Sequence, residues 1–435
     1  MKKTYIKRVG DKWFYVDVIN TSAGNIRIGS MPEISKWLAK EKIDTNYVIL
    51  PPPITTQAGD NYTGEEFVFW YKIYNNDFSP ITYMGEKNNV IYLYKRLKRT
   101  VNSTFNKNKT KIIRVKRVQR IFRKKYLKLN TPINITDKIK VILTPDNIII
   151  YENDTKIYEW INSQNFVGIN KKVNKYLASY KKNRKYIKHL EIIAIGNGNG
   201  FRGNTSNFII RYADRAIWID VMAKPFLALK KIKLHWDNIT DYFISHIHED
   251  HIEGLSAVLK RASDTGKSVN IITTKKIMKE LKKIYKFLFP DFDSIVNHIN
   301  IIPNASLPYY HGYLTVRLNH HVLPSGTLSL KVQFKNNIFA LSGDTKYDSN
   351  LASKTKNNPA FDISWYNDCH LVFHEVEFEN PDNVHTYYKE IQNIMKKING
   401  KVLVYHSSSE KFLLDGVREY TRYIIKEGKV IIKKV

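Results

Sequence analysis

The feature that most constrains this chain is the run His246-Ile-His248-Glu-Asp250-His251, which directly follows the apolar stretch Tyr242 to Ser245. The apolar stretch predicts a strand, and the polar run predicts a loop that leads into a helix. In such a loop His246 and His248 can chelate one ion from alternate positions, while Asp250 and His251 turn toward a second ion. Imidazole and carboxylate groups are ligands that zinc prefers. Four ligand-type residues within six positions therefore predict a metal site at the end of this strand.

Further ligand-type residues follow along the chain, mostly where apolar stretches end. Asp344 comes after the stretch NNIFALSG, and His406 comes after KVLVY. All 13 histidines lie between His189 and His406. Histidine is the commonest metal ligand and acid–base side chain, so we expect the chemistry in the C-terminal part.

The segment HHVLPSG offers His320 or His321 as one more ligand before the predicted strand TLSLKV. His320 keeps the alternation of Leu314, Val316 and Leu318, whereas His321 stands at the point where this alternation is expected to break. We favour His321, and His320 remains the alternative.

On these residues the chain resembles the metallo-β-lactamase superfamily over residues 190–435. The resemblance implies an αββα sandwich with two zinc ions at one edge, although manganese is also compatible with the ligands. In that family's arrangement the two ions have separate ligands and share one bridging aspartate. Carried over, His246, His248 and His321 would hold the first ion, Asp250, His251 and His406 the second, Asp344 would bridge both, and Asp220 would support the site.

Two further motifs resemble ribonuclease Z and related phosphodiesterases. These are LVFHEVEF, which contains Glu375, and NVHTYYKE, which contains His385. The resemblance implies that Glu375 orients His385, and that His385 is the general acid; ordinary surface residues are the alternative interpretation. Only 22 residues separate His321 from Asp344, so the long tRNA-binding arm of ribonuclease Z is absent.

The charge is unevenly distributed. The chain has 70 Lys and Arg against 40 Asp and Glu, a net charge of +30, and residues 1–189 contribute +22 of it (37 basic against 15 acidic residues). Residues 95–128 hold 15 basic and no acidic residues, and residues 171–188 hold eight basic and no acidic residues. Such an excess favours a nucleic-acid partner, contacted through residues 95–189. Codon usage in an AT-rich genome, which favours Lys, Asn and Ile, is the alternative explanation.

These patterns predict three regions. Residues 1–94 form a mixed α/β domain, residues 95–189 a basic segment with a small β-hairpin unit, and residues 190–435 the metallo-β-lactamase-fold domain. Within them, EFVFWYKIY at 66–74 predicts a buried strand, and residues 141–160 predict a hairpin or three-stranded meander. No internal repeat is apparent in the sequence.

The composition also bears on the compartment. A single cysteine, Cys369, excludes an internal disulfide framework and favours a reducing compartment, so we expect a cytoplasmic protein. No apolar run approaches the roughly 18–20 residues of a membrane span, and no secretory leader is evident. The oligomeric state stays open, and a dimer is compatible with the sequence.

Three functional hypotheses follow. The first is a nuclease or phosphodiesterase that hydrolyses nucleic acid with a two-metal-activated hydroxide. The second keeps this chemistry but acts on small cyclic nucleotides, which the short segment before Asp344 favours. The third is a nucleic-acid-binding protein whose metal site only stabilises the fold.

Overall fold

The structure is a computed structural model of the 435-residue chain. It divides into two compact units, residues 1–176 and 177–435. The residues that it describes are 5–10, 15–31, 34, 37–38, 41–52, 54–55, 59, 61–103, 118–161, 175–176, 186–199, 204–321, 325–355, 358–378, 384–407 and 416–435.

The first unit contains a six-stranded sheet whose strands follow the chain in the order β1 to β6. The strands β1 to β3 are antiparallel, and β3 to β6 are parallel. The helix α2 lies between β4 and β5 along the chain, and α3 lies between β5 and β6. Apolar side chains from the strands and from both helices form the core. The elements are β1 (Tyr5–Gly10), β2 (Tyr15–Thr21), β3 (Gly24–Ile28), β4 (Tyr47–Ile49), α2 (Glu66–Tyr74), β5 (Ile81–Gly85), α3 (Lys87–Ser103) and β6 (Phe122–Tyr126).

A second sheet of the first unit is an antiparallel meander of β7 (Ile133–Asn134), β8 (Ile139–Leu143), β9 (Asn147–Glu152) and β10 (Thr155–Ile161). The turn between β9 and β10 places Asn153 and Asp154 at φ 49° and 60°. Two consecutive left-handed residues are typical of the tightest hairpin turns. The meander predicted over residues 141–160 is confirmed.

The strand predicted at residues 66–74 is wrong, because this segment is the helix α2. Its residues are mostly β-branched or aromatic, which favours a strand locally. Phe67 and Trp70 are buried, however, and they are spaced as one helix face requires. Tertiary packing therefore overrides the local preference.

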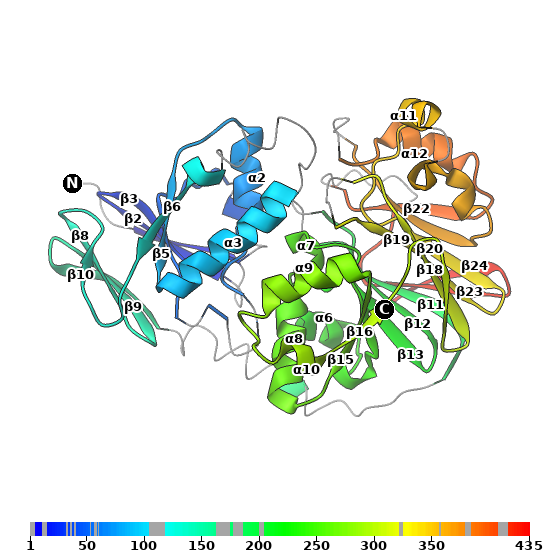
Figure 1. The fold of residues 1–435 in the computed structure, drawn as a ribbon, viewed down its shortest axis with the longest axis horizontal. Helices are drawn as coiled ribbons and strands as arrows, with labels where there is room; N and C mark the ends of the chain where they lie inside the picture. Colours follow the sequence, from blue (N-terminus) through cyan, green and yellow to red (C-terminus); the bar gives the residue numbers. More distant parts are fainter. Residues whose placement is uncertain are drawn as a thin grey trace. The chain divides into compact units, whose positions relative to one another are not determined.

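The second unit also contains two sheets (Figure 1). The eight-stranded sheet has the order β16-β15-β14-β13-β12-β11-β23-β24, and the six-stranded sheet has the order β17 to β22. The first sheet comprises β11 (Ile187–Gly196), β12 (Asn207–Ala213), β13 (Arg215–Ile219), β14 (Asp241–Phe243), β15 (Val269–Thr273), β16 (Val296–Asn300), β23 (Thr421–Lys426) and β24 (Lys429–Lys434). The second comprises β17 (Ser306–Tyr309), β18 (Gly312–Leu318), β19 (Leu328–Phe334), β20 (Asn337–Leu341), β21 (Leu371–Glu375) and β22 (Lys401–Tyr405).

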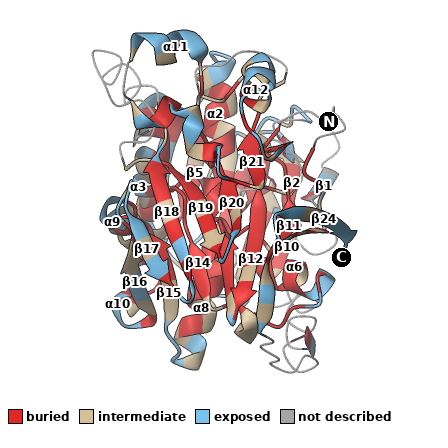
Figure 2. Cartoon of the chain, turned by 90° about the vertical axis from the view of Figure 1, so that its right-hand side faces the viewer, coloured by how far each residue is buried: buried red, intermediate tan, exposed pale blue. Residues whose placement is uncertain are grey.

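Aromatic side chains join the two sheets of the second unit. The ring centroid of Phe208 on β12 lies 5.3 Å from that of Phe373 on β21 and 5.2 Å from that of Tyr405 on β22. Figure 2 shows buried residues along strands of both sheets, among them β12, β20 and β21.

Helices cover the outer faces of both sheets. On the eight-stranded sheet these are α6 (Pro225–Lys231), α8 (Leu255–Thr265) and α9 (Lys275–Tyr285), and α8 contacts β15. On the six-stranded sheet, Ile391 and Ile394 of α12 (Tyr388–Met395) pack in one cluster with Val372 and Val402. The second unit is therefore an αββα sandwich, and the predicted metallo-β-lactamase fold class is confirmed.

The first unit repeats the topology of the second. In both, three antiparallel strands lead into three parallel strands, and a separate antiparallel meander of four strands follows along the chain. Matching backbone hydrogen bonds support the correspondence. In the first unit the N–H of Gly29 donates to the Ile49 carbonyl, that of Asn46 to Asn25, and that of Gly64 to Ser30. In the second unit the N–H of Asp220 donates to the Phe243 carbonyl, that of Thr240 to Ala216, and that of Gly254 to Val221, in the same order. The chain thus contains an internal repeat that its sequence does not reveal.

Among the helices that the structure describes, none is long and apolar enough to cross a membrane.

Candidate metal centre

Four of the predicted ligands come from one short segment after β14. The three residues of β14 and Ile244 are buried, and they hold the following loop against the sheet. His246 and His248 lie in this loop, and the short helix α7 (Glu249–Ile252) carries Asp250 and His251. All four side chains therefore project from the carboxyl end of a buried strand.

Three more predicted ligands lie at the ends of strands of the other sheet. His321 follows β18, Asp344 follows β20 and His406 follows β22. Because β20, β21 and β22 are parallel, their carboxyl ends share one edge of the sheet. The structure thus brings together all seven residues at facing edges of the two sheets, within groups of ligand atoms that lie within 4.8 Å of one another.

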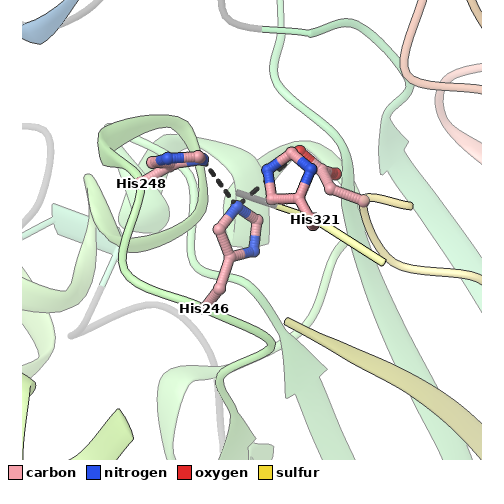
Figure 3. Close-up of side chains that lie close together, drawn as sticks. His246, His248 and His321 are labelled. Carbon is pink, nitrogen blue, oxygen red and sulfur yellow. Dashed lines mark hydrogen bonds and ion pairs between the residues drawn. The ribbon is translucent and has the colours of Figure 1, made fainter. Parts of the chain in front are cut away.

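The first group consists of His246, His248, His321 and Asp344. Figure 3 shows the three imidazole rings turned toward one another. Nε2 of His246 lies 3.0 Å from Nδ1 of His248 and 3.6 Å from Oδ2 of Asp344. Three nitrogens and one oxygen around one point are a suitable donor set for a tetrahedral zinc ion.

The second group consists of Asp250, His251 and His406. Nε2 of His251 lies 3.6 Å from Oδ2 of Asp250, and Nε2 of His406 lies 4.0 Å from the same oxygen. Asp344 faces this group as well, with Oδ1 3.4 Å from Nε2 of His251 and Oδ2 3.3 Å from Nε2 of His406. The Asp344 carboxylate therefore lies between the two groups, where one residue can contact two ions.

Outside the cluster, most of these histidines have a second partner at Nδ1. Nδ1 of His246 lies 2.9 Å from Ser245 Oγ, and Nδ1 of His406 lies 2.9 Å from Ser206 Oγ. Nδ1 of His251 lies 2.9 Å from Asp220 Oδ2, and Nδ1 of His321 lies 3.2 Å from the Val384 carbonyl oxygen. Such outer contacts fix the ring orientation and direct Nε2 toward a metal. Asp220 also accepts hydrogen bonds from the Ser245 N–H and hydroxyl groups.

Three atoms of the cluster show that its polar groups fit a cation. His251 Nε2, His321 Nε2 and Asp344 Oδ1 are buried and have no hydrogen-bond partner among the described residues. A buried polar atom without a partner costs about 1–3 kcal/mol. Metal ions held by the two groups would satisfy all three atoms, so the donor set fits divalent transition metals.

The electrostatics favour the metal-binding protonation state in four of the ligands but not in His251, whose pKa burial lowers but the carboxylates of Asp344, Asp250 and Asp220 raise well above the ordinary value. Burial holds the pKa of His246 and His321 well below the ordinary value, with His251 adding to this effect at His246 and Asp344 opposing it at His321, and burial lowers the pKa of His248 to about 4. Burial alone would raise the pKa of Asp344, yet His406 and His251 hold it well below its usual range. These three imidazoles are thus neutral and this carboxylate is charged near neutral pH, as metal ligands must be.

Glu375 and His385 form a hydrogen-bonded pair beside the cluster. Glu375 ends β21 and is fully buried, and its Oε2 lies 2.9 Å from Nδ1 of His385. Its Oε1 accepts the Thr386 N–H at 2.8 Å. Burial raises the pKa of Glu375, while the charge of His385 opposes this effect. The His385 side chain is 19% exposed, and a ligand atom of His385 lies within 4.8 Å of His406 and Asp344, so this ring can reach a substrate.

Other candidate residues lie outside the cluster. The ring of His320 packs 5.1 Å from Phe361 and is not among the clustered ligands. His374 is buried, and its Nδ1 lies 2.8 Å from the Glu375 carbonyl. Cys369 is buried in the core beneath α12.

Backbone strain concentrates at the same place. Asp220 and His406 have φ values of 49° and 59°, in a backbone region that residues other than glycine rarely adopt. Gly343, immediately before Asp344, has φ 59°, and a Cβ atom there would meet the Leu328 carbonyl. Strained residues of this kind tend to occur at functional sites.

Ser206 and Ser245 are contacts that the sequence did not predict. Ser245 could have been suspected because it directly precedes His246 at a strand end. Ser206 lies 200 residues before its partner His406, and nothing local marks it.

The first unit has no equivalent cluster among its described residues. By strand register, the positions of Asp220 and His246 are occupied there by Gly29 and Pro52. Asn61 stands at the position of His251, because each lies three residues before the matched glycine, Gly64 or Gly254. At these three matched positions the second copy of the fold has ligand-type residues, and the first copy does not.

Comparison with known proteins identifies relatives of the second unit. Residues 190–430 match the family model described as "Anti-Pycsar protein Apyc1". The chain is 21% identical over 230 residues to the Anti-Pycsar protein Apyc1 of Paenibacillus sp. (strain J14), an alignment that covers 51% of this chain and 90% of that protein.

Solved structures with a similar fold include three of different kinds. The metallo-β-lactamase fold protein YhfI of Bacillus subtilis is 16% identical, with 51% of this chain and 87% of YhfI covered and a TM-score of 0.42. A diphosphatase of the PhnP family is 14% identical, with 53% of this chain and 95% of the diphosphatase covered and a TM-score of 0.42. A long-form RNase Z from yeast is 14% identical, with 93% of this chain and 69% of the RNase Z covered and a TM-score of 0.40.

Proposed function

This chain belongs, through residues 190–430, to the family described as Anti-Pycsar protein Apyc1, and we propose that its second unit is a metal-dependent phosphodiesterase. The observation that carries the proposal is the cluster of seven ligand-type residues between the two sheets, with Glu375 and His385 beside it. The seven residues would hold two transition-metal ions, zinc or manganese. When bound, such a pair lowers the pKa of a water molecule and neutralises negative charge on a phosphodiester.

The residues of the chain have separate tasks in this proposal. Asp250 would accept a proton from the attacking water and orient it. His385 would protonate the oxygen that leaves the phosphorus, since its ring is partly exposed beside the cluster. Glu375 would keep the His385 ring in position and support its positive charge.

We propose a small cyclic nucleotide as the favoured substrate. The Paenibacillus relative is covered over 90% of its length by 230 residues of this chain, so the family chemistry does not depend on a first unit. Between His321 and Asp344 the second unit has only the hairpin of β19 and β20 and its flanking residues. With 22 residues, this segment is too short to hold an inserted arm that would grip a long nucleic acid.

Nucleic acid is the second candidate, because the first unit has basic residues on its surface. Arg120, Arg123 and Lys124 are exposed. Residues 104–117, which include Arg117, and most of the second basic segment (171–188) lie outside the described residues. Exposed cations of this kind can contact phosphates without sequence preference.

The direct test is hydrolysis by the purified full chain, loaded with zinc or manganese. Cyclic mononucleotides, single- and double-stranded DNA, and RNA would be supplied separately, and the products separated by chromatography. His321→Ala should lower the rate by more than the roughly 100-fold that outer contacts of a metal site contribute. His320→Ala is the matched control, because this neighbouring ring packs on Phe361 outside the cluster. Absence of hydrolysis of every phosphodiester by metal-loaded protein would contradict the proposal.

A further inference from the structure

The second unit has a cavity of about 410 Å³ at the sheet edge opposite to the metal centre. β13 to β16 are parallel, and the cavity is lined by residues at their starting ends, including Arg215, Thr240, Asn270 and Asn297. The ligands His246 and His248 follow the other end of β14, and no residue of the metal centre lines the cavity. A volume of this size lies in the usual range for small-molecule sites, roughly 300–1,000 Å³.

Positive charge dominates the lining of this cavity. Arg215, Arg261 and Lys267 line it, against one carboxylate, that of Asp237. Within the part of the chain that the structure describes, neither Arg261 nor Lys267 has an ion-pair partner. The Arg215 guanidinium stacks on Tyr310, 3.1 Å from the ring centroid, and forms long ion pairs with Asp214 at 3.6 Å and with Asp241 at 4.0 Å. Its buried Nε has no hydrogen-bond partner in the described residues. Cationic groups with unused donors favour an anionic ligand.

The remaining walls are ordered by hydrogen bonds and aromatic packing. Nδ2 of Asn270 donates to Asp241 at 2.9 Å, and Nδ2 of Asn297 donates to Ser268 at 2.9 Å. Trp236 and Tyr242 also line the cavity, and both are buried and pack against each other with ring centroids 5.9 Å apart. The lining of the cavity thus combines cationic residues with an aromatic wall formed by Trp236 and Tyr242.

The internal repeat shows that the fold does not require this cavity. The first unit has a pocket at the corresponding place of only about 40 Å³. At the end of α2 in the first unit, the N–H of Asp77 donates to the Lys72 carbonyl. At the end of α8 in the second unit, the N–H of Lys267 donates to the Ala262 carbonyl in the same way, so the two helix ends correspond. Asp77 and Lys72 form an ion pair across the helix end.

At the same positions the second unit has a cation and a small side chain. Lys267 replaces the acid, and Ala262 replaces the lysine. The internal ion pair is thereby lost, a positive charge remains without a partner, and the space is about ten times larger. Of these two matched pockets, the one in the second unit has the larger volume and the greater excess of cationic over acidic residues in its lining.

We propose that this cavity binds a small phosphorylated molecule through Arg215, Arg261 and Lys267. A phosphate group satisfies several cationic donors at once, and the Trp236 and Tyr242 wall suits an attached planar group. This binding site is separate from the metal centre, and it does not depend on the reaction proposed there.

Calorimetric titration of the metal-loaded full chain tests the proposal, with inorganic phosphate and a 5′-mononucleotide as separate probes. Arg261→Ala combined with Lys267→Ala should weaken binding of at least one probe by about tenfold or more, because charge-assisted contacts are stronger than neutral ones. Lys260→Ala combined with Lys429→Ala removes the same net charge away from the cavity and should leave the affinity unchanged. Circular dichroism would verify that both double variants are folded.

The two probes identify the ligand more closely. Binding of both indicates that the phosphate group is sufficient, whereas binding of the mononucleotide alone indicates that the aromatic wall contributes. The proposal is wrong if neither probe binds to the unmodified chain. It is equally wrong if the Arg261 and Lys267 variant binds both probes as the unmodified chain does, because the metal centre would then account for the binding.

Discussion

Glu375 is the residue whose position most clearly separates catalysis from metal binding. Its carboxylate is buried, it is hydrogen-bonded to His385 Nδ1 and to the Thr386 N–H, and it belongs to none of the ligand groups. Its proposed effect on the reaction therefore acts through His385. Removing its charge should change proton transfer and leave the metal in place.

We expect Glu375→Gln and His385→Ala each to lower kcat by about 100-fold or more, the usual contribution of a general acid. The double variant should be little worse than either single variant, since the two residues act as a unit. In Glu375→Gln the alkaline limb of the pH–rate profile should move to lower pH, because the imidazolium loses its negatively charged partner.

Glu377→Gln is the matched control, since it makes the same change two residues away and should leave kcat unchanged. Elemental analysis should find the same metal content in all variants. An unchanged alkaline limb in Glu375→Gln would contradict the role of Glu375 in orienting and charging His385.

The sequence predicted the residues of the centre better than their surroundings. His246, His248, Asp250 and His251 are adjacent along the chain, and other ligand types follow apolar strands, so local patterns reveal them. The choice between His320 and His321 depends on where β18 ends and on the packing of Phe361, which local patterns do not encode. Ser206 reaches His406 only because β12 and β22 lie in facing sheets.

At the scale of the element, α7 and α8 are held in place by a close backbone approach at Gly254. Its N–H donates to the Val221 carbonyl at 2.8 Å, and a Cβ atom would lie 1.8 Å from the Met222 carbonyl. Its φ of −86° is accessible to any residue, so the requirement for glycine is purely steric. This contact ties the helix that carries Asp250 and His251 to the loop after Asp220.

Gly254→Ala should therefore destabilise the second unit by at least about 3 kcal/mol, the upper range for overpacking, and should release metal. Gly266→Ala, at the other end of α8, should cost only about 1 kcal/mol, because its φ is left-handed but nothing lies within 4 Å of its Cβ position. Urea unfolding and metal analysis of the two variants measure both effects. Similar losses in the two variants would show that the close approach at Gly254 is unimportant.

The helix α2 illustrates why elements of the first unit were harder to predict. EFVFWYKIY has the composition of a strand, yet in the repeat it stands at the position of α8. The repeat itself is invisible in the sequence because its copies share a backbone topology rather than side chains. Where one copy has His246, the other has Pro52.

At the scale of the whole molecule, the net charge of +30 needs a physical explanation. If the first unit contacts nucleic acid, replacing Arg120, Arg123 and Lys124 by alanine should weaken binding to all sequences equally. The slope of log affinity against log salt should fall by roughly 2–3, since each lost phosphate contact removes about 0.7–0.9.

Replacing three exposed lysines of β24 is the control for this prediction. Lys429, Lys433 and Lys434 lie in the second unit and carry the same total charge. Equal salt slopes for both triple variants would show that the charge of the first unit makes no specific phosphate contacts. The cyclic nucleotide would then remain the better substrate hypothesis.

The most direct test of the central claim is the metal content of the purified full chain, measured by elemental analysis after incubation with zinc or manganese and removal of the excess. The seven clustered residues predict about two ions per chain, the number that a two-metal hydrolase site holds. Asp344→Ala should lose most of one equivalent, because Asp344 contacts both groups, whereas His320→Ala should retain two. A metal-free chain after incubation, or full occupancy in Asp344→Ala, would contradict the account.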